Sequence, residues 1–119
     1  MGFKVLLDSN SLIYSLKQRA DIRDILSRNP EVSGIVVPKC VLVELERMSN
    51  DVSFSRGALA LAETFPIAEG EGPADDCILK IASEGSYFIL TNDRGLLDRA
   101  KKMKIRTLSF KQRRRIEFS

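Results

Sequence analysis

Four acidic residues stand at positions from which they could bind a metal ion together: Asp8, Glu44, Asp75 and Asp93. Asp8 and Asp93 each follow a short apolar run that is typical of a strand buried on both faces. Because open α/β sheets bind ligands beyond the carboxyl ends of their strands, both acids are expected at one edge of a sheet. Carboxylates gathered there repel one another and stay ionised only when cations compensate their charge.

Glu44 and Asp75 are expected on helices that border the same edge. Glu44 lies beside the apolar row of its predicted helix, whereas Glu46 leans toward another side, so geometry favours Glu44 mildly. Asp75 shares the inward face of a helix predicted over 74–84. Asp76 is rotated about 100° from that face, and stabilisation of the helix dipole explains a carboxylate there.

The chemistry of these groups is constrained because the chain contains no histidine. This excludes Ser-His-Asp and Cys-His nucleophiles and any histidine-ligated metal. Oxygen ligands alone favour Mg²⁺ or Mn²⁺ over zinc. A hydrated ion of this kind can polarise a phosphate and supply hydroxide for phosphodiester hydrolysis. An isolated Asp8 would be explained as a helix cap, but three further acids favour a metal site.

Short apolar strands alternate with amphipathic helices along the whole chain, which predicts one α/β domain over 1–119 with a parallel sheet and helices on both faces. Ser9 or Asn10 is available to cap the first helix. A polar break is expected at 49–53 and a loop at 69–73. Strands are predicted at 4–7, 34–38, 87–90 and 105–110, and helices at 9–16, 21–26, 39–48, 56–65, 74–84 and 96–103.

The positive charge is concentrated near the end of the chain. The net charge is only +3, yet nine Lys or Arg and no acid occur between Arg99 and Arg115. Such a run is often a solvated face, but its separation from the acids suggests an anionic partner such as nucleic acid. The candidate residues for binding such a nucleic acid, for example RNA, are Lys111, Arg113, Arg114 and Arg115.

The two cysteines and the hydropathy pattern indicate a cytoplasmic protein. Cys40 and Cys77 lie far apart among apolar residues and form no CxxC pair, so buried reduced thiols are expected. No apolar run reaches the ~20 residues that span a bilayer, and the first residues lack the layout of a signal peptide. We therefore expect no membrane partner.

Four short segments, in this order, resemble the PIN-domain family of metal-dependent ribonucleases. The block from Ala74 to Leu96 is most similar to the archaeal and eukaryotic branch associated with small-subunit rRNA processing. The segments are Leu7-Asp8-Ser9-Asn10, Val43-Glu44-Leu45-Glu46, Ala74-Asp75-Asp76-Cys77-Ile78, and Leu90-Thr91-Asn92-Asp93 followed by Gly95-Leu96.

The resemblance implies a three-layer α/β/α fold with a central parallel sheet of about five strands. It implies that Asp8, Glu44, Asp75 and Asp93 hold one or two Mg²⁺ or Mn²⁺ ions, and that a metal-activated water attacks single-stranded RNA. Small polar residues are expected beside this pocket: Thr91, Asn92, and Asn10 as an orienter of water or ligand. Asp76 is expected to support the pocket from outside or to be structural.

The resemblance leaves the biological role open. The same chemistry would serve rRNA processing with a ribosome-assembly partner or the toxin of a toxin–antitoxin pair, and a homodimer could also determine substrate choice. Two other classes compete with the nuclease. A phospho-acceptor receiver domain also has an acidic Mg²⁺ pocket. It needs an acceptor Asp at the end of a central strand and a Lys at the end of a later strand, and Lys111 is only a weak candidate for that Lys. An RNA-binding module without turnover would use only the basic run.

Overall fold

The computed structural model describes residues 2–48 and 53–119 of the chain. In these residues, strands and helices alternate much as predicted, and most predicted elements shift by a few residues at their ends. The strands are β1 (Phe3–Leu7), β2 (Val32–Pro38), β3 (Ile67–Ala68), β4 (Tyr87–Leu90), β5 (Thr107–Lys111) and β6 (Arg115–Phe118). The helices are α1 (Ser9–Lys17), α2 (Ile22–Ser27), α3 (Lys39–Met48), α4 (Ser55–Ala62), α5 (Ala74–Glu84) and α6 (Arg94–Lys102).

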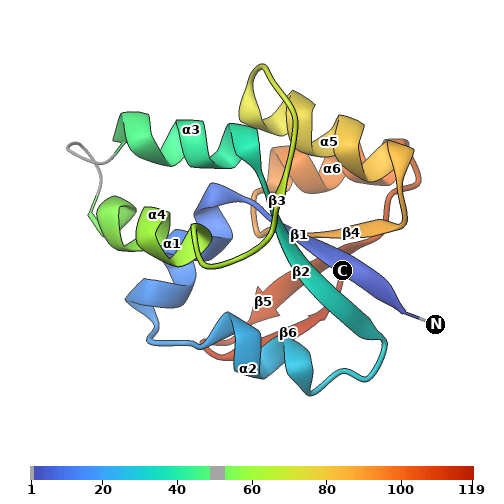
Figure 1. The fold of residues 1–119 in the computed structure, drawn as a ribbon. Helices are drawn as coiled ribbons and strands as arrows, with labels where there is room; N and C mark the ends of the chain where they lie inside the picture. Colours follow the sequence, from blue (N-terminus) through green and yellow to red (C-terminus); the bar gives the residue numbers. More distant parts are fainter. Residues whose placement is uncertain (1, 49–52) are drawn as a thin grey trace.

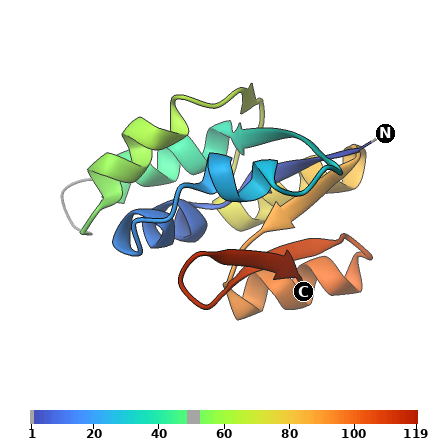
Figure 2. The ribbon, with the colours of Figure 1, turned by 90° about the horizontal axis from the view of Figure 1, so that it is seen from below.

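The sheet has the order β3-β2-β1-β4-β5-β6, which places β1 near its centre (Figure 1). Side chains of a strand alternate between the two faces, and β1 shows this directly. Val5 and Leu7 join the core formed with α1 to α4, whereas Leu6 joins the core formed with α5 and α6. Helices therefore cover both faces, as Figure 2 also shows from below, and the predicted three-layer α/β/α architecture is confirmed.

The register of the two central strands brings their ends together. β1 and β4 run parallel, with Leu7 opposite Leu90. The residues that follow, Asp8 and Thr91, therefore leave the sheet side by side. This is the edge at which the sequence predicted the acids to meet.

The sheet has six strands in the described residues, whereas the apolar pattern predicted four and the family resemblance implied about five. The short β3 was not predicted, and neither was β6, which pairs antiparallel with β5 through partners such as Lys111 and Arg115. The predicted basic tail at 111–115 is thus the turn of a hairpin. A run of charged residues conceals the hairpin in the sequence, because the following Arg115–Phe118 offers only one half-buried apolar side chain, Ile116.

The expectation of reduced cysteines is wrong. Cys40 on α3 and Cys77 on α5 are both buried and form a disulfide, with their Cα atoms 6.5 Å apart. The sequence shows that each cysteine lies on an apolar helix face. It does not show that α3 and α5 pack with these two faces in contact.

The predicted polar break at 49–53 lies outside the described residues, except for Ser53. Across the described residues, no helix combines the length and the apolar character needed to cross a membrane.

Candidate active site

An acidic pocket of about 370 Å³ lies at the carboxyl ends of β1 and β4. Asp8, Glu44, Asp75 and Asp93 all line it, together with Ser9 and Asn10. Its apolar wall consists of Val41, Met48, Pro73, Ala74 and Ile78. The four acids, which are up to 85 positions apart in the sequence, thus line one cavity. Two of them follow strand ends and two lie on helices.

Asp8 is the most buried of the four acids, with 6% of its surface exposed. It caps α1, because its Oδ1 accepts a hydrogen bond of 2.8 Å from the Ser11 amide, and its Oδ2 accepts one from the Thr91 hydroxyl. The N-cap is therefore Asp8 rather than Ser9 or Asn10. Burial raises the pKa of Asp8 to about 6, with the Asp75 charge adding to the rise and the bonds from Thr91 and Ser11 opposing it.

Asp93 lies three residues after the end of β4 and, like Asp8, is the N-cap of the helix that follows. Its Oδ1 caps α6 by accepting a hydrogen bond of 2.9 Å from the Leu96 amide, and its own amide donates to the Thr91 hydroxyl at 3.0 Å. Thr91, which is fully buried, thus contacts both strand-end acids. A hydroxyl that donates to one acid and accepts from the backbone of the other fixes their relative positions.

Glu44 and Asp75 complete the pocket from α3 and α5. Ser9, at the start of α1, donates a hydrogen bond to Glu44. Asp75 is more exposed, yet its pKa is raised, first by partial desolvation and then by the charges of Asp93, Glu44 and Asp76, with Arg99 opposing them. The acids therefore repel one another in the absence of a cation.

Two of the expected polar residues contact other parts of the protein. Asp76 does not line the acidic pocket, and instead forms an ion pair of 2.6 Å with Arg99. The Asn92 side chain exchanges two hydrogen bonds with the Phe110 backbone and so ties the end of β4 to β5. Asn10 is exposed at the rim of the acidic pocket, where it was expected.

Sequence reasoning missed the roles of Ser9, which lines the acidic pocket, and of Ser11, which contacts Asp8. The Ser11 amide is capped by Asp8, and the Ser11 hydroxyl donates to the Leu90 carbonyl at 2.8 Å, which joins α1 to the end of β4. The Ser-Asn-Ser sequence after Asp8 indicated a helix start, but the partners of the two hydroxyls are 35 and 79 residues away. Only the tertiary structure identifies them.

The donor set of the acidic pocket suits a hard divalent ion, since it offers carboxylate, hydroxyl and amide oxygens and neither thiolate nor imidazole. Among the described residues, no three Asp, Glu or Cys side chains are grouped tightly enough to hold a metal ion as they stand. Burial raises the pKa values of Asp8 and Asp75, and in both cases the negative charge of neighbouring acids adds to the rise. A cation at this place would relieve that repulsion.

The raised pKa of Asp8 predicts how stability depends on pH in a chelator. Between pH 4 and pH 6 the folded protein holds a proton on Asp8 that the unfolded chain has released, so the free energy of unfolding should fall as pH rises through this window. The fall should be at most about 3 kcal/mol, and Asp8→Asn should flatten it. Urea titrations at pH 4, 5, 6 and 7 test this, and an unchanged slope in Asp8→Asn would contradict it.

The candidate RNA-binding residues lie at the opposite end of α1 from the acidic pocket. Arg113, Arg114 and Arg115 line a second cavity there, together with Lys17 and Arg19. Lys111, at the end of β5, is exposed and lies outside the lining of this cavity.

Comparison with known proteins shows the family to which the chain is similar. Residues 5–113 match the family described as "PIN like domain". The chain is 30% identical over 108 residues to the rRNA-processing protein FCF1 of Saccharomyces cerevisiae, covering 85% of this chain and 56% of that protein. It is 28% identical over 116 residues to ribonuclease VapC9 of Archaeoglobus fulgidus, covering 93% and 85% of the two chains.

A solved structure extends the likeness to three dimensions. The structure of the PIN domain endonuclease Utp24 superposes with a TM-score of 0.83 at 27% identity, and the match covers 98% of this chain and 90% of that chain. The chain spans just over half the length of the yeast FCF1 proteins that it matches.

Proposed function

This chain belongs to the PIN-like domain family, and we propose that it is a Mg²⁺- or Mn²⁺-dependent endoribonuclease that hydrolyses phosphodiester bonds in single-stranded RNA. The observation that carries the proposal is the convergence of Asp8, Glu44, Asp75 and Asp93 on one pocket. Membership over residues 5–113 argues against the receiver-domain hypothesis.

The four acids are the groups that would hold the metal. When bound, the ion would lower the pKa of a coordinated water and stabilise the negative charge that develops on the phosphate. Asp8 and Asp93 are held for this task, because each has one oxygen committed to a helix amide and both contact Thr91. The Ser9 hydroxyl restrains Glu44 by donating a hydrogen bond to it, and the exposed Asn10 can hydrogen-bond water or RNA at the rim.

RNA processing is the role that we favour, with rRNA as the class of substrate. It rests on the likeness to the two yeast rRNA-processing proteins and to the Utp24 endonuclease. In this role we infer that a ribosome-assembly partner or a second copy of the chain helps to select the substrate, an inference that rests on the likeness to rRNA-processing proteins.

A toxin role is the second candidate. The match to ribonuclease VapC9 extends over 85% of that protein, a larger share than for the yeast relatives. In this case the partner would be an antitoxin. Expression of the isolated chain separates the roles, since a toxin should arrest growth and a processing enzyme should not.

Cleavage of a labelled, unstructured RNA tests the proposed chemistry. We expect cleavage with Mg²⁺ or Mn²⁺ and none with a chelator. A circular RNA of the same sequence should also be cut, because an endonuclease needs no free end. Cleavage that continues undiminished in the chelator, or no cleavage with either metal, would contradict the proposal.

A further inference from the structure

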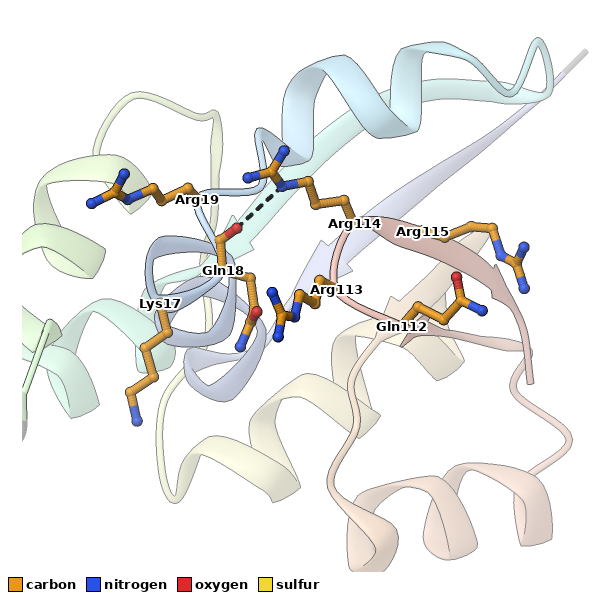
Figure 3. Close-up of a pocket in the computed structure, with 7 residues that line it drawn as sticks. All are labelled: Lys17, Gln18, Arg19, Gln112, Arg113, Arg114 and Arg115. Atoms are coloured by element: carbon orange, nitrogen blue, oxygen red, sulfur yellow. Dashed lines mark hydrogen bonds between the residues drawn. The ribbon is translucent and has the colours of Figure 1, made fainter.

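A basic pocket of about 810 Å³ lies between the end of α1 and the turn that joins β5 to β6 (Figure 3). Lys17, Gln18 and Arg19 form one side, and residues 112–115 form the other. The two segments are about 95 positions apart in the sequence, so the fold itself assembles this pocket. No carboxylate is among its lining residues.

Specific contacts build the pocket from these two segments. The Tyr14 hydroxyl donates to the Gln112 carbonyl at 3.0 Å, and Arg114 Nε donates to the Gln18 carbonyl at 3.3 Å, a bond drawn in Figure 3. Arg19 and Gln112 have positive φ values of 52° and 58°, which turn the chain sharply on each side. The pocket is therefore held in place before any ligand binds.

The cations of the basic pocket are mostly uncompensated. Within residues 2–48 and 53–119, Lys17, Arg19, Arg113 and Arg114 form no ion pair, whereas Arg115 pairs with Glu117 at 2.6 Å. Lys17 alone could be explained by the dipole of α1, whose carboxyl end favours a cation. That explanation does not extend to the arginines of the β5–β6 turn, which belong to another element. Four cations that line one pocket favour a polyanion.

A polar stripe on α1 connects the basic pocket to the acidic pocket. Asn10, Tyr14 and Lys17 follow the i, i+4, i+7 spacing of one helix face. Asn10 and Lys17 are exposed and line the acidic and basic pockets respectively, and Tyr14 is half-buried between them. The nine residues of α1 separate the pockets by about 13 Å, which a few nucleotides of single-stranded RNA can span.

We propose that the basic pocket binds the phosphate backbone of single-stranded RNA that runs along the Asn10–Tyr14–Lys17 stripe from the acidic pocket. This inference rests on the proposed function for the identity of the polyanion. Phosphates are recognised in the basic pocket by charge and by the planar donors of the arginines. The half-buried Tyr14 ring offers a surface for a base along the way.

Binding of a fluorescein-labelled oligouridylate to the full chain in a chelator tests the proposal, because no cleavage occurs under these conditions. Lys17→Gln/Arg113→Gln removes one charge from each side of the pocket. Affinity should fall at least about fivefold. The plot of the logarithm of the association constant against the logarithm of the salt concentration should become less steep by about 1.4, as expected for two lost contacts to a single strand. Lys101→Gln/Lys102→Gln, on the exposed end of α6, removes the same charge and should change affinity less than twofold.

Equal weakening in the two double variants would show a general effect of net charge and would overturn the basic pocket as the site. Competition by a polyglutamate peptide would also overturn the proposal if the peptide displaced the labelled RNA as well as unlabelled RNA of equal charge does. The pocket would then bind acidic proteins. The two proposals fail separately. Pocket-dependent binding without metal-dependent cleavage refutes only the nuclease, and cleavage with binding unaffected by Lys17→Gln/Arg113→Gln refutes only the pocket.

Discussion

Asp8→Asn is expected to lower metal-dependent RNA cleavage by about 10³-fold or more while the protein stays folded. The substitution removes the charge of the most buried acid in the acidic pocket. It keeps one side-chain oxygen, which can cap α1, and asparagine is itself a good N-cap. The new NH2 group replaces the oxygen that accepts from Thr91 and can instead donate to the Thr91 hydroxyl. Initial rates with saturating Mg²⁺ or Mn²⁺, measured alongside the unfolding midpoint, provide the test.

The matched control for this variant lies on α6. Asp98→Asn makes the same chemical change at an exposed position outside the acidic pocket, and its cleavage rate should equal that of the wild type. Full activity in Asp8→Asn would show that the metal chemistry has been assigned to the wrong residues. A comparable loss in Asp98→Asn would show instead that the assay responds to surface charge.

Reduction of the Cys40–Cys77 disulfide should lower the free energy of unfolding by about 4 kcal/mol, a second large effect. The bond closes a loop of 37 residues, and the loss of that constraint gives the unfolded chain more conformational entropy. It also joins α3, which carries Glu44, to α5, which carries Asp75. Denaturant titrations with and without a reductant measure the change.

Cys40→Ser/Cys77→Ser provides the control for the reductant itself. Its unfolding midpoint should lie below that of the oxidised wild type and should not respond to reductant. If the wild type also failed to respond, and labelling showed two accessible thiols on denaturation without reductant, the disulfide would not exist in the protein.

The four acids of the acidic pocket could be predicted because local rules place each of them. A strand that stops at a carboxylate fixes Asp8 and Asp93 at the edge of a parallel sheet, and helical periodicity turns Asp75 inward. The same periodicity placed Asp76 on a different face of the helix from Asp75, and in the structure Asp76 forms an ion pair with Arg99. Glu44 was favoured only mildly over Glu46, and the structure places Glu44 in the lining of the pocket.

What the sequence could not reveal depends on contacts between distant segments. The Ser9–Glu44 bond, the Thr91 bridge between Asp8 and Asp93, and the disulfide all require knowledge of how helices pack. The β5–β6 hairpin was hidden for another reason, since its turn consists of charged residues and β6 is largely exposed. The basic run was therefore predicted as a tail, although it forms one side of a pocket with α1.

The location of Mn²⁺ in crystals of the protein tests the central claim most directly. The account predicts an anomalous difference peak within the acidic pocket, among the carboxylates of Asp8, Glu44, Asp75 and Asp93, with those side chains drawn inward around it. Mn²⁺ bound only at other acids, with this pocket free of anomalous density at a saturating concentration, would contradict it.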